Sequence, residues 1–125
     1  MSNDTKEQQE FEKRYEINYL MSAQRDLKRL MDFLLSNEVS PTRAKEIILD
    51  IVKKLRVLSD NPHMGFSIGG KYGFETPYRA LVCGKYLAVY EVIEAGSNEN
   101  GRVEVRRIYH GREDYLSQLL DSRAK

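Results

Sequence analysis

The alternation of apolar and polar positions predicts that the chain opens with a strand followed by a helix. Residues 15–20 alternate with a period of two, which is typical of a strand that buries one face. We expect Ser22 to cap the helix that follows, because serine oxygen readily accepts a hydrogen bond from a free N–H of the first turn. The apolar stripe of this helix is formed by Ala23, Leu27, Leu30 and Leu34.

A second helix has the clearest signals in the chain. Ser40 is a favourable N-cap, and Pro41 suits the first helical position, where its missing N–H would have no helical partner. The pattern ends before Pro62, because proline disfavours a helical residue before it. Since only residues around 37–39 separate the two helices, we expect an antiparallel hairpin. Its second stripe comprises Ala44, Ile47, Ile48, Ile51, Leu55 and Leu58.

Residues 63–73 are rich in glycine and include Lys71, a combination found in loops that bind phosphate. The P-loop spacing G-x-x-x-x-G-K-[ST] is absent, because Tyr72 stands where Ser or Thr would hold magnesium. We therefore predict a mobile connecting loop here.

The period then changes back to that of strands. Residues 78–83, 85–95 and 102–109 are rich in β-branched and aromatic side chains, and glycine-containing turns separate them. Short connections favour an antiparallel meander. Residues 115–120 have the spacing of a short C-terminal helix. The expected fold class is therefore a two-layer α+β fold: an antiparallel sheet, with the first strand at the edge of the meander, packed on the helical hairpin.

The length of 125 residues indicates one domain with a single core, which we place at residues 15–121. Residues 1–14 form a polar N-terminal extension that we expect to be flexible, and residues 122–125 form a tail. The N-terminus has no apolar segment of the kind found in a signal peptide or membrane anchor. We predict a soluble, cytoplasmic protein that does not act at a membrane.

Composition limits the chemistry further. The net charge of +1 does not indicate a nucleic-acid-binding protein, although a local basic patch remains possible. Cys83 is the one cysteine, so no intramolecular disulfide forms and a reducing compartment is expected. One cysteine and two histidines do not make a structural zinc site, and we expect no metal and no small-molecule cofactor.

Three segments together resemble the RelE/ParE superfamily of toxins from type II toxin–antitoxin systems. They are the apolar stripe from Ala44 to Pro62, YRALVCGKYLAVYEV across Tyr78–Val92, and VRRIYHGRED across Val105–Asp114. The resemblance covers roughly residues 15–116. It implies a RelE/ParE-like fold and a small cytoplasmic protein that a cognate antitoxin holds inactive in a tight complex.

The superfamily has two activities. ParE-type members inhibit DNA gyrase and are not known to catalyse a reaction, whereas RelE-type members cut mRNA on the translating ribosome without a metal. The ending IYHGRED is closer to the ParE type, and a basic residue typical of the nuclease branch falls on Leu87, or on Ala88 in a shifted register. ParE-like action is therefore slightly favoured, with a metal-independent endoribonuclease and a non-toxic binding module as alternatives.

Metal-free RNA cleavage needs a base, a cation for the phosphate and an acid. The resemblance gives Arg79, His110, Arg112 and Tyr115 as candidate catalytic residues, and Lys85, Arg106 and Arg107 as candidate contacts to nucleic acid or target. Each also has a structural interpretation. Arg106 and Arg107 point to opposite faces of a regular strand, so without a bulge they do not line one pocket. His110 suits a turn, and Cys83 suits the core.

Overall fold

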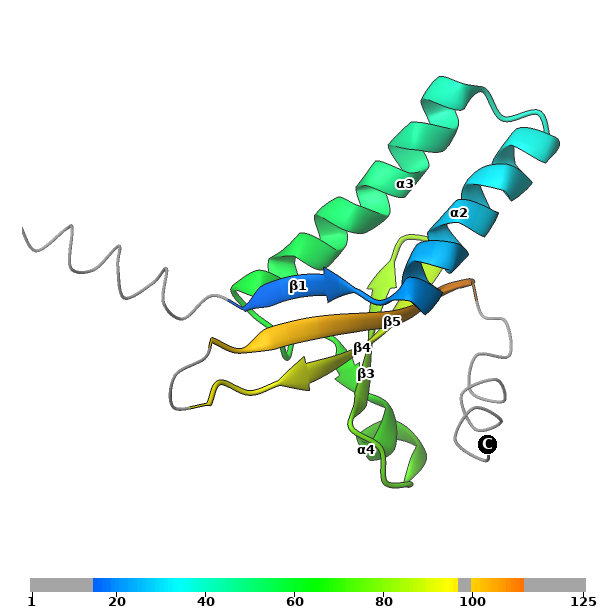
Figure 1. The fold of residues 1–125 in the computed structure, drawn as a ribbon. Coiled ribbons are helices and arrows are strands. Elements are labelled where there is room, and N and C mark those ends of the chain that lie inside the picture. The colour runs from blue at the N-terminus through cyan, green and yellow to red at the C-terminus, as the bar shows by residue number, and fades with distance from the viewer. Residues whose placement is uncertain (1–14, 97–99, 112–125) are drawn as a thin grey trace, which may run out of the picture.

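The computed structural model describes residues 15–96 and 100–111, which form an α+β fold (Figure 1). This confirms the predicted class. The predicted N-terminal extension and C-terminal helix lie outside the described residues. The elements in chain order are β1 (Glu16–Tyr19), α2 (Met21–Ser36), α3 (Pro41–Arg56), the 3-10 helix η1 (Val57–Ser59), β2 (Phe66–Ser67), α4 (Ile68–Tyr72), β3 (Tyr78–Cys83), β4 (Tyr86–Ile93) and β5 (Arg102–His110).

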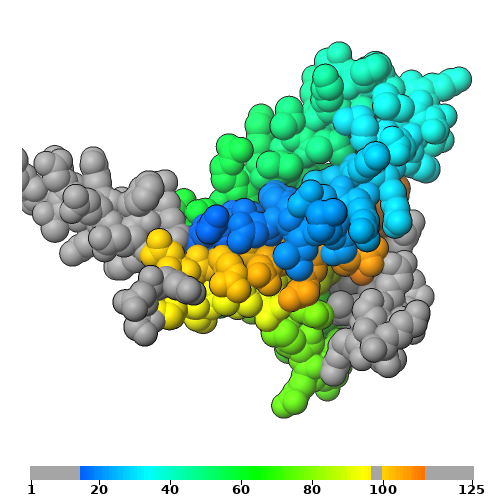
Figure 2. All heavy atoms as spheres, viewed as in Figure 1, coloured from blue at the N-terminus to red at the C-terminus, as the bar shows by residue number. Residues whose placement is uncertain are grey.

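The described strands form one sheet in the order β1-β5-β4-β3-β2. The meander β3-β4-β5 is antiparallel, as predicted, and β1 pairs beside it at the edge. In the space-filling view β1, β5 and β4 are neighbouring blue, orange and yellow bands (Figure 2). One expectation is wrong in detail: β1 runs parallel to β5, so the sheet is mixed. Parallel pairing needs a long connection between the strands, and the rest of the fold supplies it.

The helical hairpin of α2 and α3 forms as the sequence predicts, apart from its first cap. Ser40 Oγ accepts the backbone N–H of Arg43 at 3.2 Å, and Pro41 is the first residue of α3. By contrast α2 begins at Met21 without a side-chain cap. Ser22 Oγ donates instead to the backbone oxygen of Arg106 at 2.6 Å, which joins α2 to β5. The expected capping role of Ser22 is therefore wrong.

The two faces of the sheet carry separate apolar clusters. On the face covered by the hairpin, hereafter the helix face, residues such as Leu55, Tyr90 and Val105 are buried together. On the other face, hereafter the open face, Ile68, Leu87 and Tyr109 pack together beside the short helix α4. Figure 1 shows the hairpin and α4 on opposite sides of the strands. The hairpin thus leaves the open face to α4 alone among the described helices.

The glycine-rich segment is more structured than predicted, since it contains β2 and α4. Ser67 Oγ accepts the Gly70 N–H at 3.0 Å and so caps α4. Gly65 lies so close to β3 that an added Cβ would be 2.3 Å from the backbone oxygen of Ala80. The prediction of a simple mobile loop is wrong, because glycine here permits a close backbone approach.

No helix in the described part of the chain is long and apolar enough to span a membrane.

Candidate functional site

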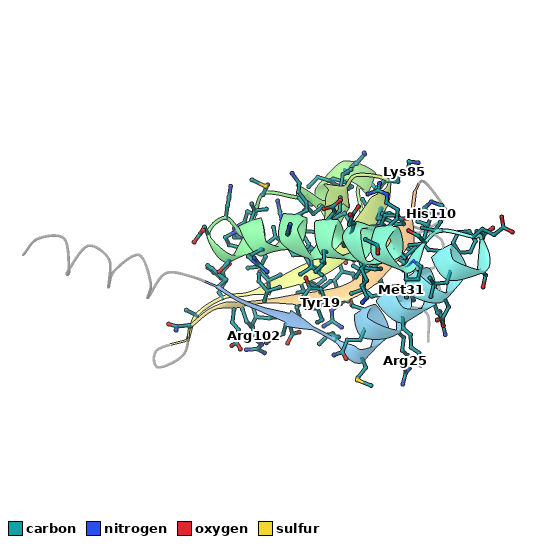
Figure 3. All side chains as sticks on the ribbon, turned by 90° about the horizontal axis from the view of Figure 1, so that it is seen from above. Tyr19, Arg25, Met31, Lys85, Arg102 and His110 are labelled. Carbon is teal, nitrogen blue, oxygen red and sulfur yellow. The ribbon has the colours of Figure 1, made fainter. Side chains whose placement is uncertain are left out.

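Three surface hollows converge where β3 turns into β4 and β5 ends. Tyr86 and His110 line all three, whose volumes are 300, 750 and 590 Å³. The two residues are opposite one another in the β4–β5 register, and their ring centroids are 5.1 Å apart. Lys85 and His110 lie at the same end of the molecule, while Arg102 lies at the opposite end (Figure 3). This end of the sheet is the candidate site.

The 750 Å³ hollow opens on the open face, and we call it the open-face hollow. Two glycines with positive φ angles shape its rim: Gly84 (62°) lies in the β3–β4 turn, and Gly111 (63°) follows β5. The N–H of Gly111 donates to the backbone oxygen of Lys85, which fixes the end of β5 against the turn. The lining residues are Phe66, Lys71, Tyr72, Val82, Gly84, Lys85, Tyr86, Leu87, His110 and Gly111.

The 590 Å³ hollow lies between the helical hairpin and the same turn, and we call it the hairpin-side hollow. Its lining is mainly apolar, but it includes the carboxylate of Asp50, and its Arg43 pairs with Glu46 at 3.1 Å. The hairpin-side hollow therefore carries charges of both signs. The lining residues are Phe33, Leu34, Val39, Arg43, Ile47, Asp50, Ile51, Lys54, Cys83, Gly84, Lys85, Tyr86 and His110.

Arg79 lies away from this end and binds the backbone. Its guanidinium donates to the carbonyl oxygens of His63 at 3.0 Å and Gly65 at 2.5 Å. Arg79 is opposite Tyr90, whereas His110 is opposite Tyr86. That four-residue offset along β4 corresponds to roughly 13 Å. The structure therefore does not bring the two predicted catalytic residues together.

A β-bulge changes where Arg106 and Arg107 point. The register shifts so that Val89 pairs with Arg107 and Tyr90 with Val105, which leaves Arg106 as the extra residue of β5. Both arginines consequently contact open-face rings: Arg106 lies 5.2 Å from the Tyr78 ring centroid and Arg107 5.1 Å from that of Tyr109. In a regular strand the two side chains would point to opposite faces of the sheet, and the bulge places both on the open face.

Each of these two arginines has an internal acidic partner. Arg106 pairs with Glu91 at 2.8 Å. Arg107 donates to the buried carboxylate of Asp26 at 2.7 and 3.2 Å, and this hydrogen bonding raises the pKa of Arg107. Asp26 also accepts the backbone N–H of Ile108 at 2.9 Å. Ile108 lies beyond residues 102–105, the part of β5 that pairs with β1. Both arginines thus stabilise the sheet and its contact with α2.

The phenols and the thiol near the site are held in their neutral forms. Burial raises the pKa of Tyr86 and of Tyr109, so both phenols keep their protons near neutral pH. Burial also raises the pKa of the Cys83 thiol to about 11, and Cys83 is a core residue as predicted. Within residues 15–96 and 100–111, no cluster of three His, Cys, Asp or Glu side chains could hold a metal ion.

Of the predicted site residues, the structure brings Lys85 and His110 together. Arg79, Arg106 and Arg107 have the internal contacts described above, and Arg112 and Tyr115 lie outside the described residues. The sequence interpretation missed Lys71, Tyr72 and Val82 as parts of one surface. No signal in the sequence marks Val82, because it stands in an apolar strand and its 55% exposure follows from the structure.

Comparisons with known proteins identify relatives of the chain. The sequence profile of the family described as "ParE toxin of type II toxin-antitoxin system, parDE" matches residues 17–115. A structure described as "Chromosomal ParDE TA system from P. aeruginosa" has a TM-score of 0.61 at 18% identity, covers 78% of this chain and 97% of that chain, and shows the same fold. A "YoeB/ParE toxin from Agrobacterium tumefaciens" has a TM-score of 0.48 at 19% identity, with 76% and 97% covered. No curated protein matches the sequence.

Proposed function

Because the chain belongs to the family of ParE toxins of type II toxin–antitoxin systems, we propose that it inhibits growth by binding DNA gyrase in the cytoplasm. A cognate antitoxin neutralises it by forming a tight complex. The toxin acts by binding its target and does not carry out a chemical reaction of its own.

The observation that carries this proposal is the internal engagement of Arg79, Arg106 and Arg107, the candidate arginines that lie within the described residues. Arg79 is hydrogen-bonded to two backbone carbonyls, Arg106 to Glu91, and Arg107 to Asp26. A cation that stabilises a phosphate transition state must instead be directed at the substrate. These contacts support binding over RNA cleavage.

The chemistry of the neighbouring side chains supports the same choice. The position where the nuclease branch typically has a basic residue falls on Leu87, or on Ala88 in a shifted register, and these side chains are only 7% and 0% exposed. The raised pKa values of Tyr86 and Tyr109 make both phenols poor general bases near neutral pH. An apolar side chain in place of a cation, together with protonated phenols, favours association with a partner over RNA cleavage.

The decisive experiment compares two activities of the purified chain. We expect it to inhibit supercoiling by DNA gyrase and to leave ribosome-bound mRNA intact, and we expect added antitoxin to restore supercoiling. Cleavage of the mRNA with unaffected supercoiling would refute the proposal in favour of the nuclease. Harmless expression without either effect would indicate the non-toxic binding module.

Arg79→Ala provides a variant that separates binding from catalysis. If Arg79 were a transition-state cation, its removal would lower a cleavage rate by about a hundredfold or more. We expect instead that gyrase inhibition per folded molecule is unchanged, because the Arg79 side chain binds the backbone of residues 63 and 65. The folded fraction is measured by circular dichroism in the same samples.

A further inference from the structure

The floor of the open-face hollow is apolar although it faces solvent. Val82 is 55% exposed, and Leu87 of the open-face apolar cluster lies opposite it in the β3–β4 register. The helical hairpin packs on the other face and does not cover Val82 or Leu87. Contiguous exposed apolar surface with a polar rim is characteristic of interaction sites.

The rim of the hollow is basic. Lys71, Lys85 and His110 line it, and none of the ten described residues that line it is acidic. Among the described residues Lys85 has no ion-pair partner, unlike Arg106 and Arg107. The chain as a whole has a net charge of only +1, so the excess of basic over acidic side chains among these described residues is a local feature. Such a surface attracts a negatively charged partner.

One wall of the hollow is held in place before any partner arrives. The wall is carried by β2 and α4, with Phe66, Lys71 and Tyr72 facing the hollow. Lys71 Nζ lies 4.6 Å from the Phe66 ring centroid, which keeps the ammonium group at the rim. The loop before β2 is bound by Arg79 and by the Tyr90 hydroxyl. A preorganised wall reduces the entropy lost on binding.

From these features we propose that the open-face hollow binds the protein target through an acidic segment that carries apolar side chains. The acidic groups pair with Lys71 and Lys85, and the apolar groups cover Val82 and Leu87. The volume of 750 Å³ is sufficient for several side chains. The aliphatic side chains of Val82 and Leu87 favour the apolar side chains of a protein segment. Stacking of bases on the rings that line the walls is the alternative that the nucleic-acid measurement below tests. The inference rests on the proposed function and identifies the surface that performs it.

The test uses two variants in the hollow and two matched variants on α3. Lys85→Glu and Val82→Asp alter the rim and the floor. Lys53→Glu and Leu49→Asp make the same types of change on exposed residues of α3 that line none of the three hollows. We expect each hollow variant to raise the concentration of toxin that half-inhibits gyrase by about tenfold or more. The α3 variants should remain close to the wild type.

Thermal unfolding of all four variants distinguishes loss of contact from loss of fold. If Val82→Asp unfolds, Lys71→Glu replaces it as the second hollow variant, because Lys71 is exposed and lies on the same rim. If the folded hollow variants inhibit gyrase as well as the wild type does, the inference is wrong while the proposed function stands. If the wild type itself does not inhibit gyrase, the proposed function fails and the inference fails with it.

Two binding measurements exclude the other occupants. The affinity of each variant for the antitoxin is measured by calorimetry, and we expect the hollow variants to retain it. A loss of antitoxin binding with unchanged gyrase inhibition would assign the hollow to the antitoxin and overturn the inference. Fluorescence anisotropy with an oligothymidine probe should show no binding that depends on Lys85. Binding that Lys85→Glu abolishes would make the hollow a nucleic-acid site, which also contradicts the inference.

Discussion

The two ends of the β3–β4 pair carry similar residues that have different surroundings. At one end Arg79 is opposite Tyr90, and both bind the loop of residues 62–65, hereafter the anchored loop. At the other end Lys85, Tyr86 and His110 border open hollows. The difference is that the anchored loop presents backbone carbonyls that need donors. Arg79 donates to these carbonyls and therefore has a structural role, whereas Lys85 lies at a turn, has no such contact within the described residues, and remains available to bind a partner.

Gly65→Ala should produce the largest difference between the ends. The added Cβ would lie 2.3 Å from the Ala80 backbone oxygen and 2.8 Å from the Tyr90 hydroxyl, so the anchored loop has to move away from the sheet. We expect a loss of about 2–4 kcal/mol in the free energy of unfolding, measured by urea denaturation. The control is Gly96→Ala, where the added Cβ has no neighbour within 4 Å. Equal losses of unfolding free energy for the two variants would contradict the close approach of Gly65 to the backbone of β3.

Tyr90→Phe should have the next largest effect. The buried Tyr90 hydroxyl donates to the Pro62 oxygen at 2.8 Å and accepts the Gly65 N–H at 3.1 Å. Its removal leaves two buried backbone groups unpaired, which costs about 1–3 kcal/mol. Tyr86→Phe at the open end removes a hydroxyl that forms no hydrogen bond within the described residues, and its effect should stay within about 0.5 kcal/mol. Similar unfolding midpoints for both variants would contradict the claim that the hydroxyl is structural at the end with the anchored loop and not at the end with the hollows.

The matched pair Arg79→Met and Lys85→Met should give the smallest effects and still differ. Methionine retains much of the apolar stem of either residue and removes its charge. We expect Arg79→Met to cost about 1 kcal/mol, because two carbonyl contacts of the anchored loop are lost. Lys85→Met should change the free energy of unfolding by less than about 0.5 kcal/mol. A larger loss for Lys85→Met would show that the open end also stabilises the fold.

Local signals in the sequence were sufficient for most of the secondary structure. Ser40 and Pro41 fix the start of α3 because capping involves residues only three positions apart. The strands of the meander follow from alternation and from the glycines between them. The parallel pairing of β1 with β5 could not be predicted in this way, because its register joins residues such as Glu16 and Arg102 that are distant in the chain.

The candidate site depended still more on distant contacts. The structural role of Arg107 follows from Asp26, which lies 81 positions away on α2. The role of Arg79 follows from the anchored loop, which the sequence showed only as a glycine-rich segment. Lys85 and His110 were named from the sequence, but their proximity is set by the β4–β5 register and its bulge. Residue type indicated the candidates, and tertiary packing decided which of them remain available.

The pairing of β1 with β5 also bears on when the toxin acquires its fold during synthesis. Position 16 leaves the ribosome long before position 102, its partner in the register. At 5–20 residues per second, translation of the intervening segment takes on the order of 4–17 s. During that interval β1 has no native neighbour in the sheet, and Asp26 lacks the arginine that neutralises it. The nascent chain therefore completes its sheet only after β5 has been made, seconds after β1 has left the ribosome.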